Sequence, residues 1–411
     1  MLMGRPRPET PPLECTLPIM GSAPPNGQFT TEVFKSSGLS PYSELGLTMR
    51  KRITLVAVLD LGLALAQVPL PDSIADSWRD LLQGAVEMSK HAHYREAIYR
   101  YQVLLSEPPI ASNPELHAYV LSQMADAEIE LGQYKDAEEA SAEAIRELDS
   151  AAKAHTGTYA ITEGVLADAL RAQGNYTEAK RLAEHAVSVA ENTLKASQRR
   201  IGILLTVLSQ ILQELGELGR AEQLCRKAVK MFEERSESDM SLGNAYQNLA
   251  VIYVKRGKLK QAQDAVNNAM TSWDKVLSPH HRYDVYGLSA RIVIYQELRA
   301  FREAEQLIPE ALRLALTSFG PDHPERMILL NNCAGVYLAE KKYVEAEALL
   351  HEAADIGRRQ LPAGHPLLNN VLRNYSYALE RLHRTDEAAR ARAESQVLLA
   401  FPNRPKVDVV H

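Results

Sequence analysis

The sequence predicts an all-α solenoid of about eight helix-turn-helix repeats, because small residues return along most of the 411-residue chain at a nearly constant spacing. One alanine, the anchor of each repeat, recurs with a period of about 42 residues, which is typical of stacked supersecondary units. The eight anchors are Ala97, Ala137, Ala179, Ala221, Ala262, Ala304, Ala346 and Ala388. The residue seven positions later is small in seven repeats, and so is the residue twelve positions earlier.

Each repeat is interpreted as a hairpin of two helices. Small residues let the two backbones approach closely, and an aromatic residue or leucine three positions before most anchors fills the space beside the turn. Four repeats place a glycine five positions before the anchor, namely Gly132, Gly174, Gly216 and Gly257. Glycine readily adopts the left-handed conformation that ends a helix. Arg299, Lys341 and His383 occupy the same place in the last three repeats, so those turns are predicted to be strained or closed differently.

Three segments resemble tetratricopeptide repeats: LGQYKDAEEASAEAI, QGNYTEAKRLAEHAV and KKYVEAEALLHEAA. The usual period of that family is about 34 residues, and the longer period here resembles the kinesin light chain type, whose repeats carry a Gly-x-x-His-Pro link followed by Leu-Asn-Asn. The chain has GPDHPERMILLNN from Gly320 and a weaker AGHPLLNN from Ala363. The resemblance covers residues 73–399. It implies a right-handed superhelical solenoid of tetratricopeptide-type repeats, and it does not identify a ligand.

The region before the repeats resembles a secretory signal peptide. From Met49 the chain has a basic MRKR, a 14-residue apolar stretch interrupted by Asp60, and an Ala-x-Ala sequence that ends at Ala66. We therefore predict that residues 49–66 are a signal peptide, and that residues 1–48 are disordered or an incorrectly assigned extension. On this hypothesis the mature chain begins at Gln67 and is exported to the periplasm or the medium.

Two alternatives to export stay open. Residues 1–66 could form a native arm of a cytoplasmic protein, or the apolar stretch could be retained as a membrane tether. A stretch of 14 residues is shorter than the ~20 residues that span a bilayer, which favours cleavage over a permanent anchor. Residues 400–411 are predicted to be a disordered tail, since Pro402 and Pro405 end the last helix.

Composition and motifs exclude several classes of function. A net charge of −6 and a pI near 6.1 provide no basic stripe for nucleic acid. The sequence has no phosphate-binding loop, no H-E-x-x-H, no G-x-S-x-G and no C-x-x-C. We therefore expect a protein that is not an enzyme, with no cofactor, no metal and no small-molecule substrate. Cys225 and Cys333 are expected to be small core residues.

Three histidines return at the repeat period: His281, His323 and His365. Equivalent residues of successive repeats lie about 20 Å apart if each helix layer adds ~8–10 Å, so these three cannot share one metal ion. His323 and His365 directly precede Pro324 and Pro366. Proline suits the first turn of a helix, and the residue before it is held extended. All three histidines are therefore expected to have a structural role in the links between repeats.

The predicted binding site is the concave groove lined by the first helix of each repeat. In tetratricopeptide domains, which this chain resembles, six positions that lie 18 to 7 residues before the anchor face this groove. The later repeats place amide, basic and aromatic side chains there: Asn244, Gln247, Asn248, Asn331, Asn332, Asn370, Arg373, Asn374, Tyr377 and Arg381. Amide side chains both donate and accept, so they can bond to the backbone of an extended peptide.

An equally weighted alternative is that Asn248, Asn332 and Asn374 bond only to neighbouring helices and hold the repeats together. The functional prediction is a non-catalytic scaffold that binds a protein or an extended peptide in the groove and is exported. A cytoplasmic adaptor or regulatory repeat protein is one alternative. The other is a membrane-tethered assembly factor that touches the membrane only through an uncleaved N-terminal segment.

Overall fold

The computed structural model describes residues 75–90, 93–194, 197–234, 240–277 and 281–397. The predictions for residues 1–48, for the signal peptide and for the tail lie outside this part of the chain. Over the described residues the structure consists of helices joined by short links, with no strand. None of these helices is both long enough and apolar enough to cross a membrane.

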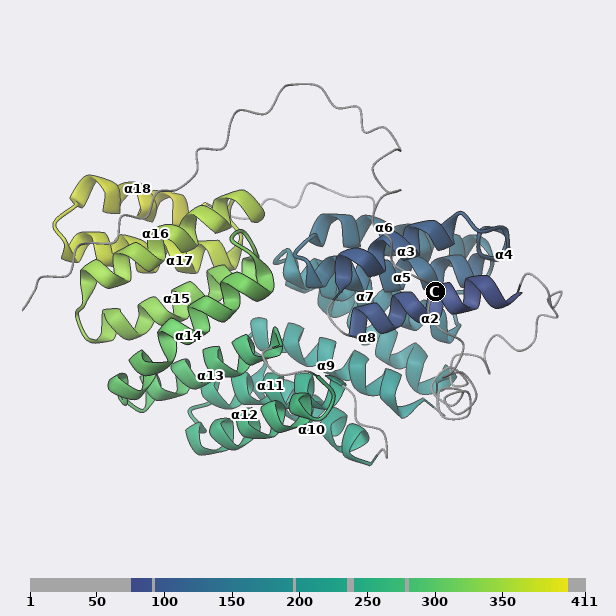
Figure 1. Cartoon of the computed structure of the whole chain (residues 1–411), viewed down its shortest axis with the longest axis horizontal. Helices are drawn as coiled ribbons and strands as arrows, with labels where there is room; N and C mark the ends of the chain where they lie inside the picture. Colours follow the sequence, from purple (N-terminus) through teal and green to yellow (C-terminus); the bar gives the residue numbers. More distant parts are fainter. Residues whose placement is uncertain (1–74, 91–92, 195–196, 235–239, 278–280, 398–411) are drawn as a thin grey trace, which may run out of the picture. The chain divides into compact units, whose positions relative to one another are not determined.

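The described helices form eight consecutive pairs (Figure 1), which confirms the predicted all-α solenoid. The first helices of the pairs are α2 (Ala75–Lys90), α5 (Pro114–Glu130), α7 (Gly157–Ala172), α9 (Gln198–Glu214), α11 (Met240–Lys255), α13 (Tyr283–Glu297), α15 (Pro324–Ala339) and α17 (Pro366–Arg381). The second helices are α3 (Tyr94–Leu105), α6 (Tyr134–Ser150), α8 (Tyr176–Thr193), α10 (Leu218–Glu233), α12 (Leu259–Asp274), α14 (Phe301–Phe319), α16 (Tyr343–Gln360) and α18 (Thr385–Ser395). One short extra helix, α4 (Pro108–Ala111), follows the first pair.

The anchors lie where the two helices of a pair meet. All eight anchor alanines are at most 1% exposed, as close helix packing requires. Cys225 and Cys333 are also buried and unbridged, which confirms them as core residues. Burial raises the pKa of each thiol to about 12, so neither is a reactive thiolate.

The turns inside the second to the eighth hairpin have one backbone conformation whether or not glycine is present. Gly132, Gly174, Gly216 and Gly257 have φ values between 68° and 83°. Arg299, Lys341 and His383 have φ values of 57°, 63° and 62°. A residue with a Cβ is disfavoured in this left-handed region, so the predicted strain in the last three turns is confirmed.

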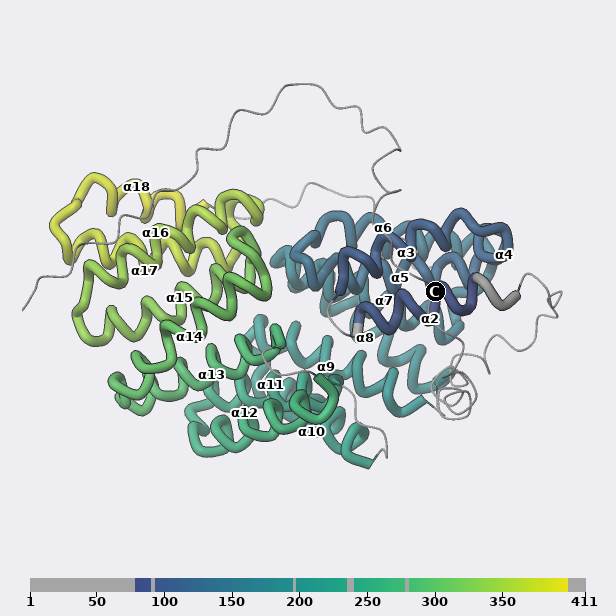
Figure 2. Tube along the Cα trace, in the orientation of Figure 1, coloured from purple at the N-terminus to yellow at the C-terminus, as the bar shows by residue number. Residues whose placement is uncertain are grey.

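The packing pattern places the first helices on the inner side of the curve. Each second helix packs against the first helix of the next repeat, and successive first helices from α5 to α17 also pack against each other. Figure 2 follows the same succession along the Cα trace. Neighbouring first helices pack against each other and are therefore closer together than neighbouring second helices. The surfaces of the first helices accordingly form the concave face that the resemblance implies.

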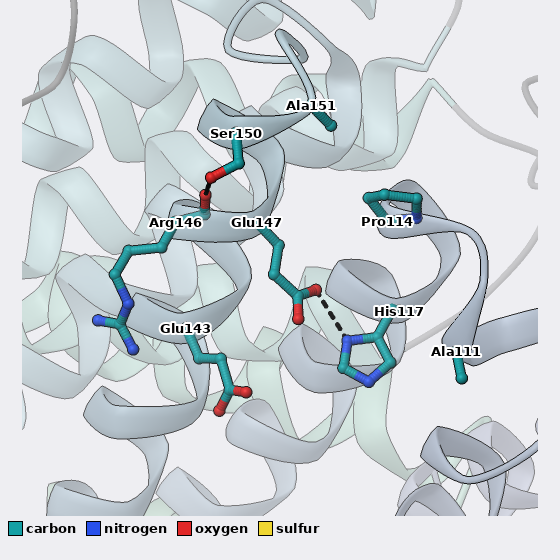
Figure 3. A pocket seen from close by; sticks show the side chains of 8 residues that line it. All are labelled: Ala111, Pro114, His117, Glu143, Arg146, Glu147, Ser150 and Ala151. Carbon is teal, nitrogen blue, oxygen red and sulfur yellow. Dashed lines mark hydrogen bonds and ion pairs between the residues drawn. The ribbon is translucent and has the colours of Figure 1, made fainter.

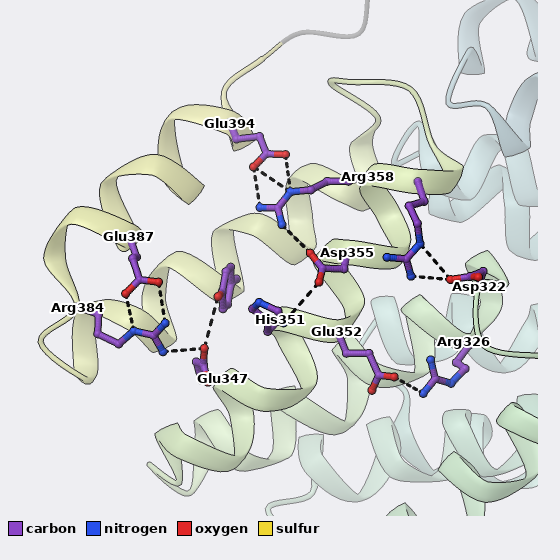
Figure 4. A network of polar contacts seen from close by, with 12 residues as sticks. Asp322, Arg326, Glu347, His351, Glu352, Asp355, Arg358, Arg384, Glu387 and Glu394 are labelled. Atoms are coloured by element: carbon purple, nitrogen blue, oxygen red, sulfur yellow. Dashed lines mark hydrogen bonds and ion pairs between the residues drawn. The ribbon is translucent and has the colours of Figure 1, made fainter. Parts of the chain in front are cut away.

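The second helices are linked across repeats by ion pairs between residues of successive units. Arg358 pairs with Glu394 at 2.8 Å and Arg384 pairs with Glu347 at 2.8 Å, as Figure 4 shows. Lys227 pairs with Glu191 in the same way in the early repeats, also at 2.8 Å. Ion pairs that solvent reaches in this way contribute little to stability. They support the repeat register without deciding the fold.

Candidate functional site

The inner face of the early repeats holds an acidic group in a concave setting. Asp126 of α5 is exposed to solvent. Even so, the surrounding protein removes enough water to raise its pKa to about 7, and the negative charges of Glu130 and Asp168 add to that shift. Asp168 itself is held by Arg171, 2.6 Å away.

The late repeats contribute to the same acidic region through Glu325, in the first turn of α15. Burial raises the pKa of Glu325 to about 7, the charge of Glu130 adds to the shift, and Arg171 and Arg282 oppose it. Glu130 and Glu325 are far apart in sequence. The influence of Glu130 on Glu325 reflects a turn of the superhelix that brings the ends of early and late first helices together.

That meeting of helix ends, the seam, consists of Tyr94, Glu130 and Ala172 on the early side and Arg282, Tyr283, His323 and His365 on the late side. The Nε2 atom of His323 lies 3.0 Å from the carbonyl oxygen of Glu130, and that of His365 lies 3.0 Å from the carbonyl oxygen of Ala172. Both carbonyl groups lie at the C-terminal ends of helices, where no following turn supplies an N–H group to donate to them.

Each seam histidine also caps its own helix. Nδ1 of His323 accepts the backbone N–H of Glu325, and Nδ1 of His365 accepts that of Leu367, both at 3.1 Å. The proton of the neutral ring is therefore on Nε2, which donates to the distant carbonyl. Burial lowers the pKa of His323 to about 4 and also lowers the pKa of His365. The two histidines therefore make the seam contacts in their neutral form.

Arg282 completes the seam with a positive charge. Its guanidinium donates to the carbonyl oxygen of Glu130 at 2.8 Å and lies over the ring of Tyr94 at 4.9 Å. The hydroxyl groups of Tyr94 and Tyr283 are 3.4 Å apart. Gly132 is packed so closely that a Cβ there would lie 2.8 Å from Pro324. A cation beside the C-terminus of α5 is also favoured by the helix dipole.

The predicted structural role of two of the three histidines is confirmed, since His323 and His365 are the N-caps of the helices that begin at Pro324 and Pro366. Their bonds to Glu130 and Ala172 were not predicted. A signal was available, because Glu130 and Ala172 occupy equivalent positions of successive repeats, as do the two histidines. His281 differs, since α13 begins after Arg282 and the ring of His281 has no hydrogen-bond partner.

Of the ten predicted groove residues, most amides contact neighbouring helices. The Nδ2 atom of Asn248 donates to Ser209 at 2.5 Å, that of Asn332 to Ser289 at 3.0 Å, and that of Asn374 to Asn331 at 2.9 Å. Each bond joins two successive first helices. These contacts are what the stacking alternative expects, and a role in peptide contact stays a prediction.

The remaining two amides in the fifth repeat are also engaged. Asn244 accepts the indole N–H of Trp273 at 3.0 Å, and Gln247 donates to the carbonyl oxygen of Tyr286 at 3.3 Å. The Oε1 atom of Gln247 is buried without a partner. The amides of α11 and α15 therefore do not form a row of unpaired side chains.

The four predicted residues on α17 remain exposed: Asn370, Arg373, Tyr377 and Arg381. Tyr377 is 47% exposed and meets Tyr343 edge-on at 6.3 Å, and Arg381 lies over the ring of Tyr343 at 5.2 Å. Arg373 donates to Asn370 at 3.2 Å. The structure brings these side chains together as a basic and aromatic surface, which we call the α17 surface.

A surface depression of about 710 Å³ lies between the start of α5 and the end of α6 (Figure 3). His117 contacts Glu147 there at 2.8 Å, and the hydroxyl of Ser150 donates to the carbonyl oxygen of Arg146 at 2.8 Å. These polar groups pair with one another across an open surface. The depression supplies no separate argument for a ligand.

Residues 111–398 match the MalT-like TPR region family, so the chain belongs to that family of tetratricopeptide repeat proteins. No curated protein matches the sequence. As a class, repeat solenoids of this kind are protein-binding scaffolds that use an extended concave surface.

Three solved structures are similar to this chain at low sequence identity. BtubC (BKLC) from P. vanneervenii is 21% identical, with 55% of this chain and 94% of that chain covered and a TM-score of 0.43. The nearly identical, kinesin light chain-type TPR-like repeats from Podosopora anserina are 21% identical, with 48% and 94% covered and a TM-score of 0.37. A Rap protein complexed with competence and sporulation factor is 16% identical, with 83% and 81% covered and a TM-score of 0.51.

Proposed function

We propose that the protein is a non-catalytic scaffold that binds a segment of a partner protein on the concave face, with the α17 surface as its main contact. The observation that carries the proposal is the exposure of Asn370, Arg373, Tyr377 and Arg381 on one first helix. The corresponding amides of α11 and α15 are used between repeats.

The chemistry of the α17 surface favours an acidic segment. Two guanidinium groups donate in the fork geometry that matches a carboxylate, and an exposed tyrosine adds an apolar face with a polar end. The Asn370 amide offers both a donor and an acceptor to a peptide backbone. Such a segment in extended form satisfies the binding mode predicted from the sequence.

The family and the fold support this proposal at a coarser level. Tetratricopeptide families are generally scaffolds rather than enzymes, and the Rap protein of similar fold was solved as a complex with competence and sporulation factor. That likeness supports a shared architecture. The preference of this chain for an acidic partner rests on the side chains of the α17 surface.

Site-specific photo-crosslinking tests the proposal. A benzophenone amino acid replaces Tyr377 on the α17 surface, or Val344 on α16, which is 66% exposed and serves as the matched control. We expect defined partner segments rich in Asp and Glu to crosslink at position 377 and not at position 344. Equal crosslinking at both positions would contradict the proposal. So would the absence of crosslinking at position 377 in an extract of the cells that naturally make the protein.

We further propose that the scaffold is exported, because residues 49–66 have the three parts of a signal peptide. Intact mass and N-terminal sequencing of the protein from its native cell fractions test this. A start at Gln67 in the envelope or medium supports export. Retention of residues 53–66 in a soluble fraction indicates the cytoplasmic adaptor instead, and retention in the membrane fraction indicates the tethered assembly factor.

A further inference from the structure

The link between α12 and α13 contains an unusual group of ligand atoms. Asp274 is the last residue of α12, Asp284 is the second residue of α13, and His281 lies between them. One oxygen from each carboxylate and a ring nitrogen of His281 all lie within 4.8 Å of one another. The Nε2 atom of His281 is 3.5 Å from Asp284 and 3.8 Å from Asp274.

The ring nitrogens of His281 are buried and have no hydrogen-bond partner. The side chain as a whole is only 9% exposed. The ring is held edge-on to Trp273 at 6.5 Å and lies 6.1 Å from Tyr283. A buried polar group without a partner is costly. A ligand that bonds to Nε2 would remove the part of that cost that belongs to Nε2.

The equivalent links of the next two repeats lack these carboxylates. The positions equivalent to Asp274 and Asp284 hold Leu316 and Arg326 in the next link, and Arg358 and Leu368 in the link after it. In those links the histidine caps its helix and joins the seam. In this link no proline follows the histidine. Arg282, rather than His281, contributes to the seam. The repeat template therefore does not explain this arrangement.

We propose that Asp274, His281 and Asp284 bind a divalent transition-metal ion, with Zn²⁺ as the best fit. Two donor atoms that are each about 2.0–2.2 Å from one zinc ion in tetrahedral geometry lie about 3.3–3.6 Å apart. The two distances from His281 Nε2 fit this requirement after shifts of a few tenths of an ångström. One imidazole and two carboxylates suit zinc, manganese or cobalt better than magnesium or calcium, which prefer oxygen alone.

Three protein ligands leave one position of a tetrahedral ion open to water or to a carboxylate of another molecule. Asp274 is 67% exposed at its side chain, so the open side faces solvent. The positive charge of the ion also lies between two carboxylates whose mutual repulsion it removes. A proton on His281 could relieve the same repulsion, and that is the competing explanation that the experiment must separate.

The experiment is titration of the full chain with Co²⁺ and Zn²⁺ in the Trp78→Phe background, which leaves Trp273 as the single tryptophan of the chain. Bound Co²⁺ is expected to quench the fluorescence of Trp273 and to give visible absorption at one equivalent, and Zn²⁺ is expected to reverse both signals. Calorimetry with Zn²⁺ gives the dissociation constant.

Two variants remove one ligand each, and one control leaves the site intact. Asp274→Asn changes an exposed residue and preserves the fold, and His281→Ala removes the imidazole. The control is His351→Ala, because His351 faces Asp355 at 3.6 Å on α16 as an exposed pair with no third ligand. We expect both site variants to weaken Zn²⁺ binding by at least about tenfold and the control to bind as the wild type does.

Two results would overturn the proposal. One is binding of Co²⁺ or Zn²⁺ that is unchanged in Asp274→Asn and His281→Ala, since the ion would then be elsewhere. The other is no binding at one equivalent by a wild-type chain with a native circular dichroism spectrum. In that case the three side chains form a polar cluster that does not bind a metal ion.

Discussion

In both the early and the late repeats, polar side chains join successive first helices on the inner face, but the side chains differ between the two regions. Between α5 and α7, the hydroxyl groups of Ser122 and Thr162 bond at 2.6 Å, and Asp126 is left exposed beside them. Between α9 and α11 the bond runs from the amide of Asn248 to Ser209. Ser122 and Thr162 lie 15 and 17 residues before their anchors, whereas Ser209 and Asn248 lie 12 and 14 residues before theirs. The polar bond between successive first helices is therefore not tied to one position of the repeat.

The packing common to both regions is expected to give the largest effect when it is disrupted. Ala346→Glu in the late repeats and Ala137→Glu in the early repeats each place a charged side chain in a fully buried contact. We expect each to lower the free energy of unfolding by roughly 3 kcal/mol or more. Thermal melting measures this. The control Ala348→Glu changes an exposed alanine on α16 and should leave the melting temperature nearly unchanged.

An unchanged melting temperature in Ala346→Glu would refute the close helix contact. An effect in Ala346→Glu but not in Ala137→Glu would show that the anchors of the two regions are not equivalent.

The second prediction concerns the late amides alone. Replacing Asn248, Asn332 and Asn374 together by Ala removes three amides that each bond to the preceding first helix. We expect a loss of about 3 kcal/mol in the free energy of unfolding, at about 1 kcal/mol for each bond. Urea denaturation followed by circular dichroism measures it. If stability is unchanged and partner binding is lost, the amides contact the partner and the stacking interpretation is wrong.

The third prediction concerns the seam that joins the two regions. The pKa of His323 is about 4 in the folded chain and about 6.5 in the unfolded chain, so the unfolded chain binds more protons between these values. Stability from this group is therefore complete above pH 6.5 and is lost as the pH falls toward 4. The loss between pH 7 and pH 5 is on the order of 2 kcal/mol.

His323→Asn isolates that contribution, because asparagine can cap α15 but does not titrate. The wild type should be the more stable protein at pH 7, and its advantage should shrink by about 2 kcal/mol at pH 5. Carboxyl groups with raised pKa values titrate in both proteins and cancel in the difference. Parallel curves for the two proteins would show that the proton on His323 has no part in the seam.

The smallest expected effect belongs to the early inner face. The pKa of Asp126 is raised to about 7, so folding disfavours its charged form. Its contribution to stability is therefore greatest at low pH and falls as the pH rises through 7. Asp126→Asn should stabilise the protein slightly at pH 8 and have less effect at pH 5. A destabilised variant at pH 8 would mean that the carboxylate has a cationic partner, such as Arg199.

The repeat architecture could be predicted from the sequence because it depends on local, periodic features. The anchors, the turn glycines and the proline that follows His323 each act within one hairpin or between neighbours. The same pattern predicted that Arg299 and Lys341 would be strained, since their place requires a positive φ. Local geometry is repeated, so one template describes it.

The site was less predictable because its contacts depend on the pitch of the superhelix. The equal spacing of Glu130 and Ala172 and of the two histidines is a signal of a repeated contact, but the local sequence does not indicate that the carbonyl of Glu130 meets His323, 193 residues later. Whether Asn332 faces a peptide or Ser289 depends on the offset between adjacent helices, which the residue pattern does not contain. The exposure of Tyr377 follows from the absence of a further first helix packed against α17 in the described chain.

The central claim is that the α17 surface binds an acidic segment while the late amides hold the repeats together. Its most direct test is the affinity of the crosslinked segment, made as a synthetic peptide, for the wild type and for Arg373→Glu/Arg381→Glu. The account predicts at least tenfold weaker binding by the double variant, at about 1.4 kcal/mol per factor of ten, with an unchanged melting temperature. Equal affinity for the two proteins would contradict it.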